Sequence, residues 1–334
     1  MPTFAIAIPV RNRKDFTTAI LQQLTDQIDR QASTQALRLS PAHIHIVVVD
    51  DDSSDGTPEL IAQQFPQVHL LRGDGNLWWT GAIAQAMTYA ADTLKTDYII
   101  WLNDDITLAD NFITQVIQRC QNPDAKVLTG GIICDQHHPN WIVFGGVIAS
   151  RLINDTAQFT QPTLNVDTLN GNIAILPTRI IADIGLPDTQ RFRHYGGDFE
   201  YICRAKENGY VVQLSSHLRA TTEYRPADVI RYMPLWIQWA TSRRLSAKWQ
   251  VLKSLSSRRS PHNVEHMVNC IHRAQPSVPQ WKYKWKYVTF YCRKLVKIIG
   301  SELIPWSVRQ NRIKAYFQRQ NIPADVAQSV LNQS

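Results

Sequence analysis

Acidic side chains closely follow two of the apolar runs that we predict to be buried strands. The two clusters are Asp50-Asp51-Asp52 after Ile44–Val49 and Asp104-Asp105 after Tyr98–Leu102. Open α/β sheets bind their ligands at the carboxyl ends of strands, so these positions are candidates for chemistry. Adjacent carboxylates repel one another unless backbone amides, a base edge or a cation binds them. We interpret Asp52 and Asp55 as turn residues, whereas Asp50 stands directly at its strand end.

The segment Asn103-Asp104-Asp105 presents hard oxygen ligands at the end of an apolar strand. Such a group suits Mg²⁺ or Mn²⁺ shared with a diphosphate, because these ions take a few carboxylates and complete their shell with phosphate oxygens. A helix-capping loop is the structural alternative for the same tripeptide. Its position after a strand, in a chain that also carries Asp50–Asp55, favours the ligand interpretation.

Several other kinds of site lack their motifs in this sequence. No GxxxxGK[ST] run is present, and no GxGxxG follows the first predicted strand, which disfavours P-loop and Rossmann dehydrogenase chemistry. No GxSxG or HExxH pattern occurs either. The five cysteines lie far apart without a CxxC pair, so neither a zinc site nor a disulfide framework is indicated, and a reducing cytosol fits best.

The elements that must position these residues alternate in the first part of the chain. Short apolar runs at 4–8, 44–49, 68–71 and 98–102 are separated by helical patterns, which is the rhythm of a mainly parallel sheet. Thr57 is predicted to cap the helix that follows the first acidic cluster. Beyond residue 125 the pattern changes to antiparallel strands at 141–148 and 173–176, followed by a helix at 198–208. We therefore expect an α/β fold, a Rossmann-like mainly parallel sheet with a small antiparallel part.

Charge divides the chain into two regions. Of its 334 residues, 44% are hydrophobic, which excludes general disorder. Residues 1–224 hold 16 basic and 24 acidic side chains, whereas residues 225–334 hold 19 and 4. We predict a domain over 1–224 and a basic, Trp-rich helical region over 225–334. An acidic body with a basic tail indicates an anionic partner near the tail.

Six segments, taken in order, resemble family 2 glycosyltransferases of the GT-A fold. They span residues 4–215 and read Ile6–Arg13, Val47–Thr57, Gly75–Ala82, Trp101–Asp105, Leu169–Asn172 and His194–Tyr210. The Asn76-Leu77-Trp78-Trp79 variant is most similar to the rhamnosyltransferase-like branch that builds bacterial surface polysaccharides. Any one motif is weak, but six in order are specific.

The resemblance implies a role for individual residues at the donor site. Pro9 and Asn12 would line the nucleotide pocket, and Asp50 would accept a hydrogen bond from a pyrimidine base. Asn76 and the 78–81 turn, with Trp79 and Gly81, would wall the donor site. The remaining residues of the donor site would be Gly171 and Asn172 beside the sugar.

The resemblance also implies a metal ligand and a base. Asp105 would bind Mg²⁺ or Mn²⁺, and Asp104 would act beside it through water or ribose. Asp198 matches the aspartate that takes the proton of the acceptor hydroxyl; read by itself, it would be a helix cap. Glu200 either orients that base or pairs with Arg204 on the helix surface.

Four features depart from the family pattern. Ala84 and Ala86 stand where many relatives have Asn and Gly, and Gly197 replaces the usual acidic residue before Asp198. The stretch where a late histidine ligand is expected reads Ala220-Thr221-Thr222-Glu223, and His217 lies slightly early. We interpret His217 as a surface histidine. Of the tryptophans at 78 and 79, we expect one to stack on a ligand and one to pack in the fold.

The segment from Trp281 onward predicts an amphipathic helix. One face collects the apolar residues Trp281, Trp285, Val288, Cys292, Leu295 and Ile299. The adjacent stripe is cationic and holds Lys282, Lys286, Arg293 and Lys297. This arrangement suits a helix at an anionic lipid interface, and equally an apolar stripe packed on the catalytic body. Nucleic acid binding has no recognised motif here, so we do not expect it.

The sequence thus predicts an inverting glycosyltransferase that uses a dTDP- or UDP-linked sugar, with rhamnose as a candidate. The expected acceptor is a saccharide on a membrane-bound polyprenyl diphosphate, in capsule- or O-antigen-type polysaccharide synthesis. A sugar-nucleotide nucleotidyltransferase, or a non-enzymatic membrane- or nucleic-acid-binding protein, is the alternative. Without a signal-peptide pattern or an apolar run of ~18 residues, the expected location is cytoplasmic and peripheral at the inner face of the membrane.

Overall fold

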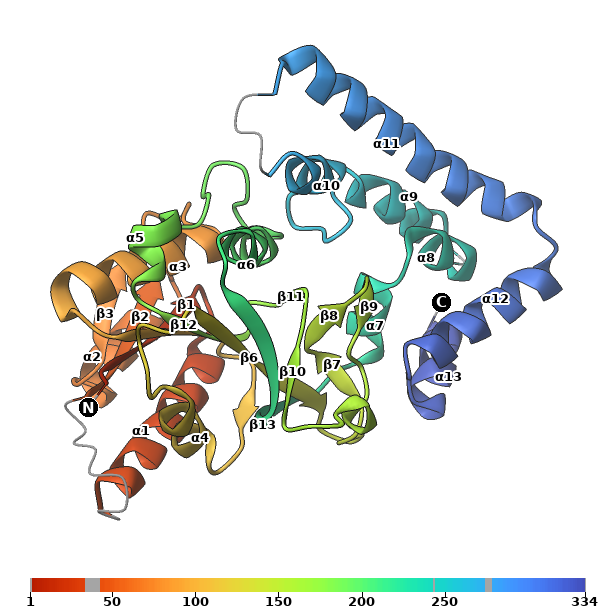
Figure 1. Cartoon of the computed structure of the whole chain (residues 1–334). Coiled ribbons are helices and arrows are strands. Elements are labelled where there is room, and N and C mark those ends of the chain that lie inside the picture. The colour runs from red at the N-terminus through yellow and green to blue at the C-terminus, as the bar shows by residue number, and fades with distance from the viewer. Residues whose placement is uncertain (1, 34–42, 243, 274–277, 334) are drawn as a thin grey trace. The chain divides into compact units, whose positions relative to one another are not determined.

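Figure 1 presents the computed structural model, which describes residues 2–33, 43–242, 244–273 and 278–333. The chain forms two units. The first comprises Met1–Arg193 with Gly197–Thr222, and the second comprises His194–Gly196 with Glu223–Ser334. The three-residue segment 194–196 therefore belongs to a different unit from the residues on either side of it.

The first unit is built on a sheet with the strand order β10-β13-β6-β12-β4-β1-β2-β3. Four neighbouring strands at one side of the sheet pair in parallel with one another, namely β1 (Phe4–Val10), β2 (Ile44–Asp50), β3 (His69–Arg72) and β4 (Tyr98–Leu102). Strands β1 and β4 are almost wholly buried, as expected for parallel strands that are covered on both faces. The registers Val10↔Asp50 and Ala7↔Trp101 bring the ends of β1, β2 and β4 to one edge of the sheet.

The other side of the sheet is mixed. β12 (Ile173–Pro177) runs antiparallel to both β4 and β6 (Val127–Asp135), and β13 (Val211–Thr222) is parallel to β6. Shorter strands complete it, namely β5 (Thr107–Leu108), β7 (Ile142–Phe144) and β10 (Thr163–Asn165). A separate sheet contains β8 (Gly146–Ile148), β9 (Arg151–Leu152) and β11 (Thr168–Leu169). The predicted α/β fold with a small antiparallel part is confirmed, although the expected strand at 141–148 is divided between two sheets.

Helices cover both faces of the large sheet (Figure 1). They are α1 (Lys14–Ser33), α2 (Thr57–Gln64), α3 (Trp78–Tyr89), α4 (Phe112–Arg119), α5 (Ile180–Ile184) and α6 (Gly197–Glu207). A π-helical turn at Ala90–Leu94 extends α3, and a 3₁₀ turn spans Thr156–Gln158. Thr57 is the first residue of α2 and not its cap, because Gly56 takes that position with φ 83°.

Alternation along β1 separates two hydrophobic cores. Ile6 and Ile8 pack in the core that also holds residues of α1 and α4, whereas Ala5 and Ala7 pack in the core under α3 and α6. Successive side chains of a strand point to opposite faces, so the small residues of β1 lie on the side where α3 packs. Helix α3 packs against these small residues. It begins at the edge where the strands end, and so brings Trp78 and Trp79 to that edge.

The second unit is helical in the part that the structure describes. Its helices are α7 (Pro226–Tyr232), α8 (Leu235–Thr241), α9 (Leu245–Ser254), α10 (Val264–Ile271), α11 (Gln280–Gly300), a 3₁₀ turn at Ser301–Leu303, α12 (Trp306–Arg319) and α13 (Ala324–Gln333). Leu235, Leu255, Val268 and Ile298 form the centre of its core. None of the described helices is both long and apolar enough to cross a membrane.

Candidate active site

Asp50 ends β2 with its side chain fully buried. Its Oδ2 atom accepts hydrogen bonds from Arg72 Nη1 at 2.8 Å and from the Ser53 amide at 3.2 Å. Among the described residues, no hydrogen-bond partner reaches its buried Oδ1 atom. A buried acceptor without a donor is costly, so a donor group that reached this oxygen would be bound favourably.

The neighbouring Asp51 has a role in the fold that the sequence did not reveal. Its carboxylate accepts hydrogen bonds from the amides of Leu77 at 3.1 Å and Trp78 at 2.9 Å. Trp78 has φ 57°, a left-handed conformation that is uncommon outside glycine. Asp51 therefore holds the turn that starts α3. Of the adjacent carboxylates, Asp50 lies at the strand end and Asp51 supports this turn.

Loops after β1 and β2 are joined through Asn12. The backbone amide of Asn12 donates to Ser53 Oγ at 2.8 Å, and its side-chain Oδ1 atom accepts from the Ser54 backbone amide at 2.7 Å. Asp55 accepts hydrogen bonds from the amides of Lys14 at 3.0 Å and Thr57 at 3.1 Å, in agreement with its interpretation as a turn residue. Pro9 lies half-buried in β1 beside this junction.

Asp104 and Asp105 differ sharply in exposure although they are adjacent. The Asp104 side chain is 4% exposed and the Asp105 side chain is 47% exposed. Arg13 binds both, with Nε 2.8 Å from Asp104 Oδ1 and Nη2 3.0 Å from Asp105 Oδ2. Thr17 Oγ1 donates a further hydrogen bond to Asp104 Oδ2 at 3.1 Å. Arg13 belongs to the Ile6–Arg13 motif, but nothing in the sequence assigned it a partner.

Burial raises the pKa of Asp104 to about 6; the charge of Arg13 opposes this rise and the charge of Asp105 adds to it. The Asp104 carboxylate is thus buried in contact with Arg13 and Thr17, whereas the Asp105 carboxylate is partly exposed to solvent. Of the two, Asp105 is the carboxylate that a diffusing cation can reach.

A divalent cation fits this strand end only if a substrate completes its coordination. Within the residues that the structure describes, no group of three or more His, Cys, Asp or Glu side chains is arranged to hold a metal ion. Mg²⁺ is commonly held by one or two carboxylates together with substrate phosphates and water. Asp105 is exposed and could supply one such carboxylate. His217 is exposed in β13, as expected of a surface histidine.

Trp79, Asn103, Gly171, Asn172 and Asp198 are brought together from four parts of the sequence. Trp79 Nε1 donates to Asn103 Oδ1 at 3.0 Å, and Asn103 Nδ2 donates to Asn172 Oδ1 at 2.7 Å. The Gly171 amide donates to Asp198 Oδ2 at 2.8 Å. A Cβ atom added to Gly171 would lie 2.4 Å from the Trp79 ring and 3.0 Å from Asp198 Cβ. Gly171 is therefore a position where no side chain fits.

Asp198 lies in the first turn of α6 and accepts hydrogen bonds from two backbone amides. The donors are Gly171 and Phe199, each at 2.8 Å. Burial raises the pKa of Asp198 above its ordinary value, while these two hydrogen bonds act in the opposite direction. A carboxylate with a raised pKa is a stronger base than an ordinary aspartate. The cap interpretation is wrong, because α6 begins at Gly197 and Asp198 already lies inside its first turn. The two amides hold the carboxylate in place, which is compatible with a base role.

Glu200 is buried and does not form a surface pair. Arg204 binds it through Nε at 2.7 Å and Nη2 at 3.1 Å. The same guanidinium donates to the carbonyl oxygens of Ile184 and Leu186. The pair therefore ties α6 to the end of α5.

The departures from the family pattern have a packing explanation. A Cβ atom added to Gly197 would lie 2.3 Å from Thr80 Oγ1, so an acidic side chain does not fit there. Ala84 and Ala86 are buried on α3, where larger polar groups would enter the core. Gly81 is also buried in α3, one turn after Leu77. Asn76 is exposed, and its amide donates to Asp74 Oδ1 at 2.9 Å within its own loop.

The sequence model of the family described as "Glycosyl transferase family 2" matches residues 5–178. The chain belongs to this family. It is a glycosyltransferase with a GT-A fold, which decides against the nucleotidyltransferase and the non-enzymatic alternatives. No curated protein sequence matches the chain.

Two solved structures illustrate the similarity of this glycosyltransferase to others. The mannosyltransferase PcManGT from Pyrobaculum calidifontis, in complex with GDP-Man and Mn2+, has 12% identity and a TM-score of 0.51 over 98% of this chain and 83% of that one. TarS 1–349 of S. aureus has 12% identity and a TM-score of 0.48 over 90% and 88% of the two chains. The similarity to the mannosyltransferase structure supports the GT-A fold of this chain.

Proposed function

We propose that this family 2 glycosyltransferase transfers a sugar from a nucleotide-diphospho-sugar with inversion, using Asp198 as the base. The observation that carries the proposal is the network from Trp79 through Asn103 and Asn172 to the Gly171–Asp198 contact. It ties the candidate base to the strand end that carries Asp105. A base and a cation-binding carboxylate on one rigid support are what sugar transfer from a diphosphate requires.

In the proposed reaction the acceptor hydroxyl oxygen attacks the anomeric carbon of the donor sugar. The new carbon–oxygen bond forms as the bond to the diphosphate oxygen breaks, and the hydroxyl proton passes to Asp198. Asp105 would hold Mg²⁺ or Mn²⁺, which neutralises the charge of the departing nucleoside diphosphate. The mannosyltransferase of the same fold holds GDP-Man and Mn2+, which supports a metal in this chain too.

We propose a dTDP- or UDP-linked donor, with rhamnose as the candidate sugar, for the strand end at Asp50. Support comes from the unpartnered buried Oδ1 of Asp50, which can accept from the N–H of a pyrimidine base. Pro9, Asn12 and Asn76 would border the nucleotide, while Asp104 would act beside Asp105. The Trp79 side chain, Gly81, Gly171 and Asn172 would enclose the sugar.

For the acceptor we propose a saccharide on a polyprenyl diphosphate, as used in capsule- or O-antigen-type synthesis. The basic region 225–334 supports this choice, because an anionic lipid-linked substrate or its membrane would be attracted to it. The enzyme would then act at the inner face of the cell membrane as a peripheral protein. Residues 1–224 would form the catalytic domain.

The proposal is tested by thermal shift and donor hydrolysis across a panel of nucleotide sugars, with and without Mn²⁺. We expect a pyrimidine-linked donor to raise the unfolding midpoint and to be hydrolysed slowly in the presence of Mn²⁺. Asp198→Asn should abolish transfer and keep donor binding, whereas Asp105→Asn should weaken the Mn²⁺-dependent part of binding. No response to any pyrimidine nucleotide would overturn the donor assignment, and loss of donor binding in Asp198→Asn would mark Asp198 as structural.

A further inference from the structure

Helix α11 has two apolar faces, and among the residues that the structure describes only one of these faces packs into a core. The inner face packs Tyr283, Phe290 and Ile298 into the core of the second unit. The outer face leaves a row of large hydrophobic side chains in solvent. Their exposed fractions are Trp281 68%, Trp285 68%, Val288 52%, Val296 69% and Ile299 57%, continuing to Leu303 at 88%.

The exposed residues form one continuous row. Their spacings of three, four or eight residues place them on the same side of an α-helix, and the thiol of Cys292 lies exposed in the same row. A 21-residue helix is roughly 30 Å long, so the row extends over a large surface. Contiguous exposed apolar surface of this kind marks a binding face.

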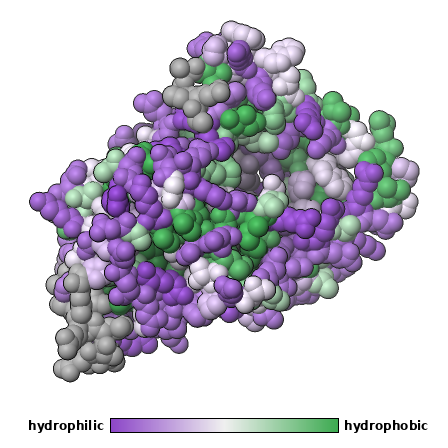
Figure 2. Space-filling view, viewed as in Figure 1, coloured by the Kyte–Doolittle hydropathy of each residue, from purple (hydrophilic) through white to green (hydrophobic). Residues whose placement is uncertain are grey.

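A cationic row runs beside the outer apolar row. Lys282, Lys286, Arg293 and Lys297 follow one another along the helix at spacings of four and seven residues, and α11 contains no acidic residue. Lys282 Nζ lies 5.5 Å from the centre of the Trp281 ring. Where Figure 1 places α11, Figure 2 shows green hydrophobic side chains next to purple hydrophilic ones. A ligand that matched both rows would present apolar and negatively charged groups side by side.

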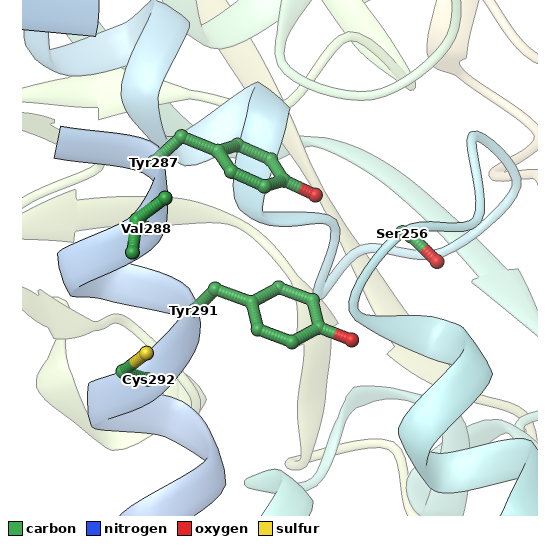
Figure 3. A pocket seen from close by; sticks show the side chains of 5 residues that line it. All are labelled: Ser256, Tyr287, Val288, Tyr291 and Cys292. Atoms are coloured by element: carbon green, nitrogen blue, oxygen red, sulfur yellow. The ribbon is translucent and has the colours of Figure 1, made fainter. Parts of the chain in front are cut away.

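An open groove adjoins the outer row on its other side (Figure 3). Tyr287 and Tyr291 project from α11 toward Ser256, and their ring centroids are 6.0 Å apart with an interplanar angle of 24°. Val288 and Cys292 line this groove as well. The apolar surface thus continues from the outer row into a groove that could take a hydrocarbon chain.

We propose that the outer face of α11 binds the surface of an anionic lipid bilayer. Tryptophans prefer the interfacial depth, the aliphatic side chains reach the acyl boundary, and the lysine and arginine groups meet lipid phosphates. A second copy of the chain is a poorer occupant, because antiparallel pairing of two such helices would set cationic row against cationic row. This inference deepens the proposed function and rests on it for the lipid-linked acceptor, but membrane binding is measurable without any sugar substrate.

The first experiment measures co-sedimentation of the full chain with vesicles of phosphatidylcholine, alone or with 30% phosphatidylglycerol. The variant Trp285→Glu/Ile299→Glu should reduce partitioning onto the anionic vesicles about tenfold or more, because it removes apolar contact and adds negative charge. The matched control is Trp249→Glu, which changes a tryptophan of α9 with 57% exposure in the same unit. The control should bind like the unmodified chain. Equal losses in both variants would overturn the assignment to α11.

A second pair of variants tests the cationic row. Arg293→Gln/Lys297→Gln removes two exposed charges of α11, and Arg312→Gln/Lys314→Gln removes two exposed charges of α12. We expect the first pair to lower partitioning onto anionic vesicles about tenfold and the second to change it about twofold at most. Equal effects would show that net charge alone, and not this face, binds the vesicles.

The thiol of Cys292 provides a readout that needs no substitution. A maleimide should modify Cys292 readily in solution and several-fold more slowly with anionic vesicles, as followed by mass spectrometry, while modification of Cys203 stays unchanged. Protection that depends on protein concentration without vesicles would identify a second copy as the occupant and overturn the proposal. Thermal shift with nucleotide sugars on the same samples tests the proposed transfer separately. If the chain binds the donor but not the vesicles, only the proposal that α11 binds a membrane is disproved.

Discussion

The candidate base depends on a glycine at the residue scale. Gly171 donates its amide to Asp198 and leaves room for the Trp79 ring against its Cα atom. Neither contact is visible in the Leu169–Asn172 motif, which shows only that a small residue precedes Asn172. The motif predicted that Gly171 is near the sugar; the geometry adds a physical reason for its size.

Gly171→Ala should therefore damage both stability and activity. The added methyl group would lie 2.4 Å from the rigid indole, so Trp79 or Asp198 must shift. We expect a loss of about 1–3 kcal/mol in the free energy of unfolding and of about 100-fold in kcat/KM. Gly300→Ala is the control, because its Cβ atom meets nothing within 4 Å. Comparable losses in both variants, by urea unfolding and donor turnover, would contradict the packing argument.

The pH dependence of stability tests the environment of Asp104. Its pKa is raised from 3.8 to about 6, with burial as the largest cause, so the folded chain binds this proton more tightly than the unfolded chain. The resulting stability is fully present below pH 3.8 and is lost as the pH rises through about 6. The loss amounts to up to about 3 kcal/mol. Urea unfolding with EDTA from pH 4 to 7.5 should show this fall relative to Asp104→Asn, and parallel curves would disprove it.

At the scale of elements, α6 is fixed by a buried ion pair. The sequence predicted the helix at 198–208, and the observed helix is Gly197–Glu207, followed by Gly209 with φ 84°. It left open whether Glu200 and Arg204 form a surface pair. The answer depends on the carbonyl oxygens of Ile184 and Leu186, which the fold brings to the same guanidinium.

Removing Arg204 should be far more damaging than removing a surface lysine of the same helix. Arg204→Ala leaves the Glu200 carboxylate buried without its partner, and we expect a loss of about 3–5 kcal/mol in the free energy of unfolding. Lys206→Ala breaks an exposed pair with Asp167 and should cost less than about 1 kcal/mol. Chemical denaturation of both variants measures the difference. Similar values would mean that the Glu200–Arg204 pair contributes no more than a surface pair.

At the scale of the whole molecule, the two units carry opposite net charge. The first unit holds 16 basic and 23 acidic residues, a net charge of −7, and the second holds 19 and 5, a net charge of +14. The boundary after Thr222 makes Glu223 part of the second unit, and His194–Gly196 joins it from the preceding region. Local composition cannot predict that these three uncharged residues belong to the second unit, because the assignment depends on contacts that form only when the chain folds.

This charge division predicts how salt acts on membrane binding. Raising NaCl from 50 to 300 mM should lower partitioning onto vesicles with 30% phosphatidylglycerol about tenfold, because ions screen the attraction between the second unit and lipid phosphates. Partitioning onto phosphatidylcholine vesicles is the control and should change little. Binding to anionic vesicles that does not weaken with salt would contradict an electrostatic contribution.

The sequence by itself determined the family, the α/β sheet and the strand ends at Asp50 and Asp105. These features depend on local patterns: buried strands leave apolar runs, and strand ends leave polar residues at fixed spacings. Only the tertiary structure decided what each polar atom does. Asp51 supports the Trp78 turn, Arg13 pairs with Asp104, and Asn103 links Trp79 to Asn172. These contacts join residues 24 to 91 positions apart, and such partners are chosen by the packing of the sheet and its helices and not by neighbours in the chain.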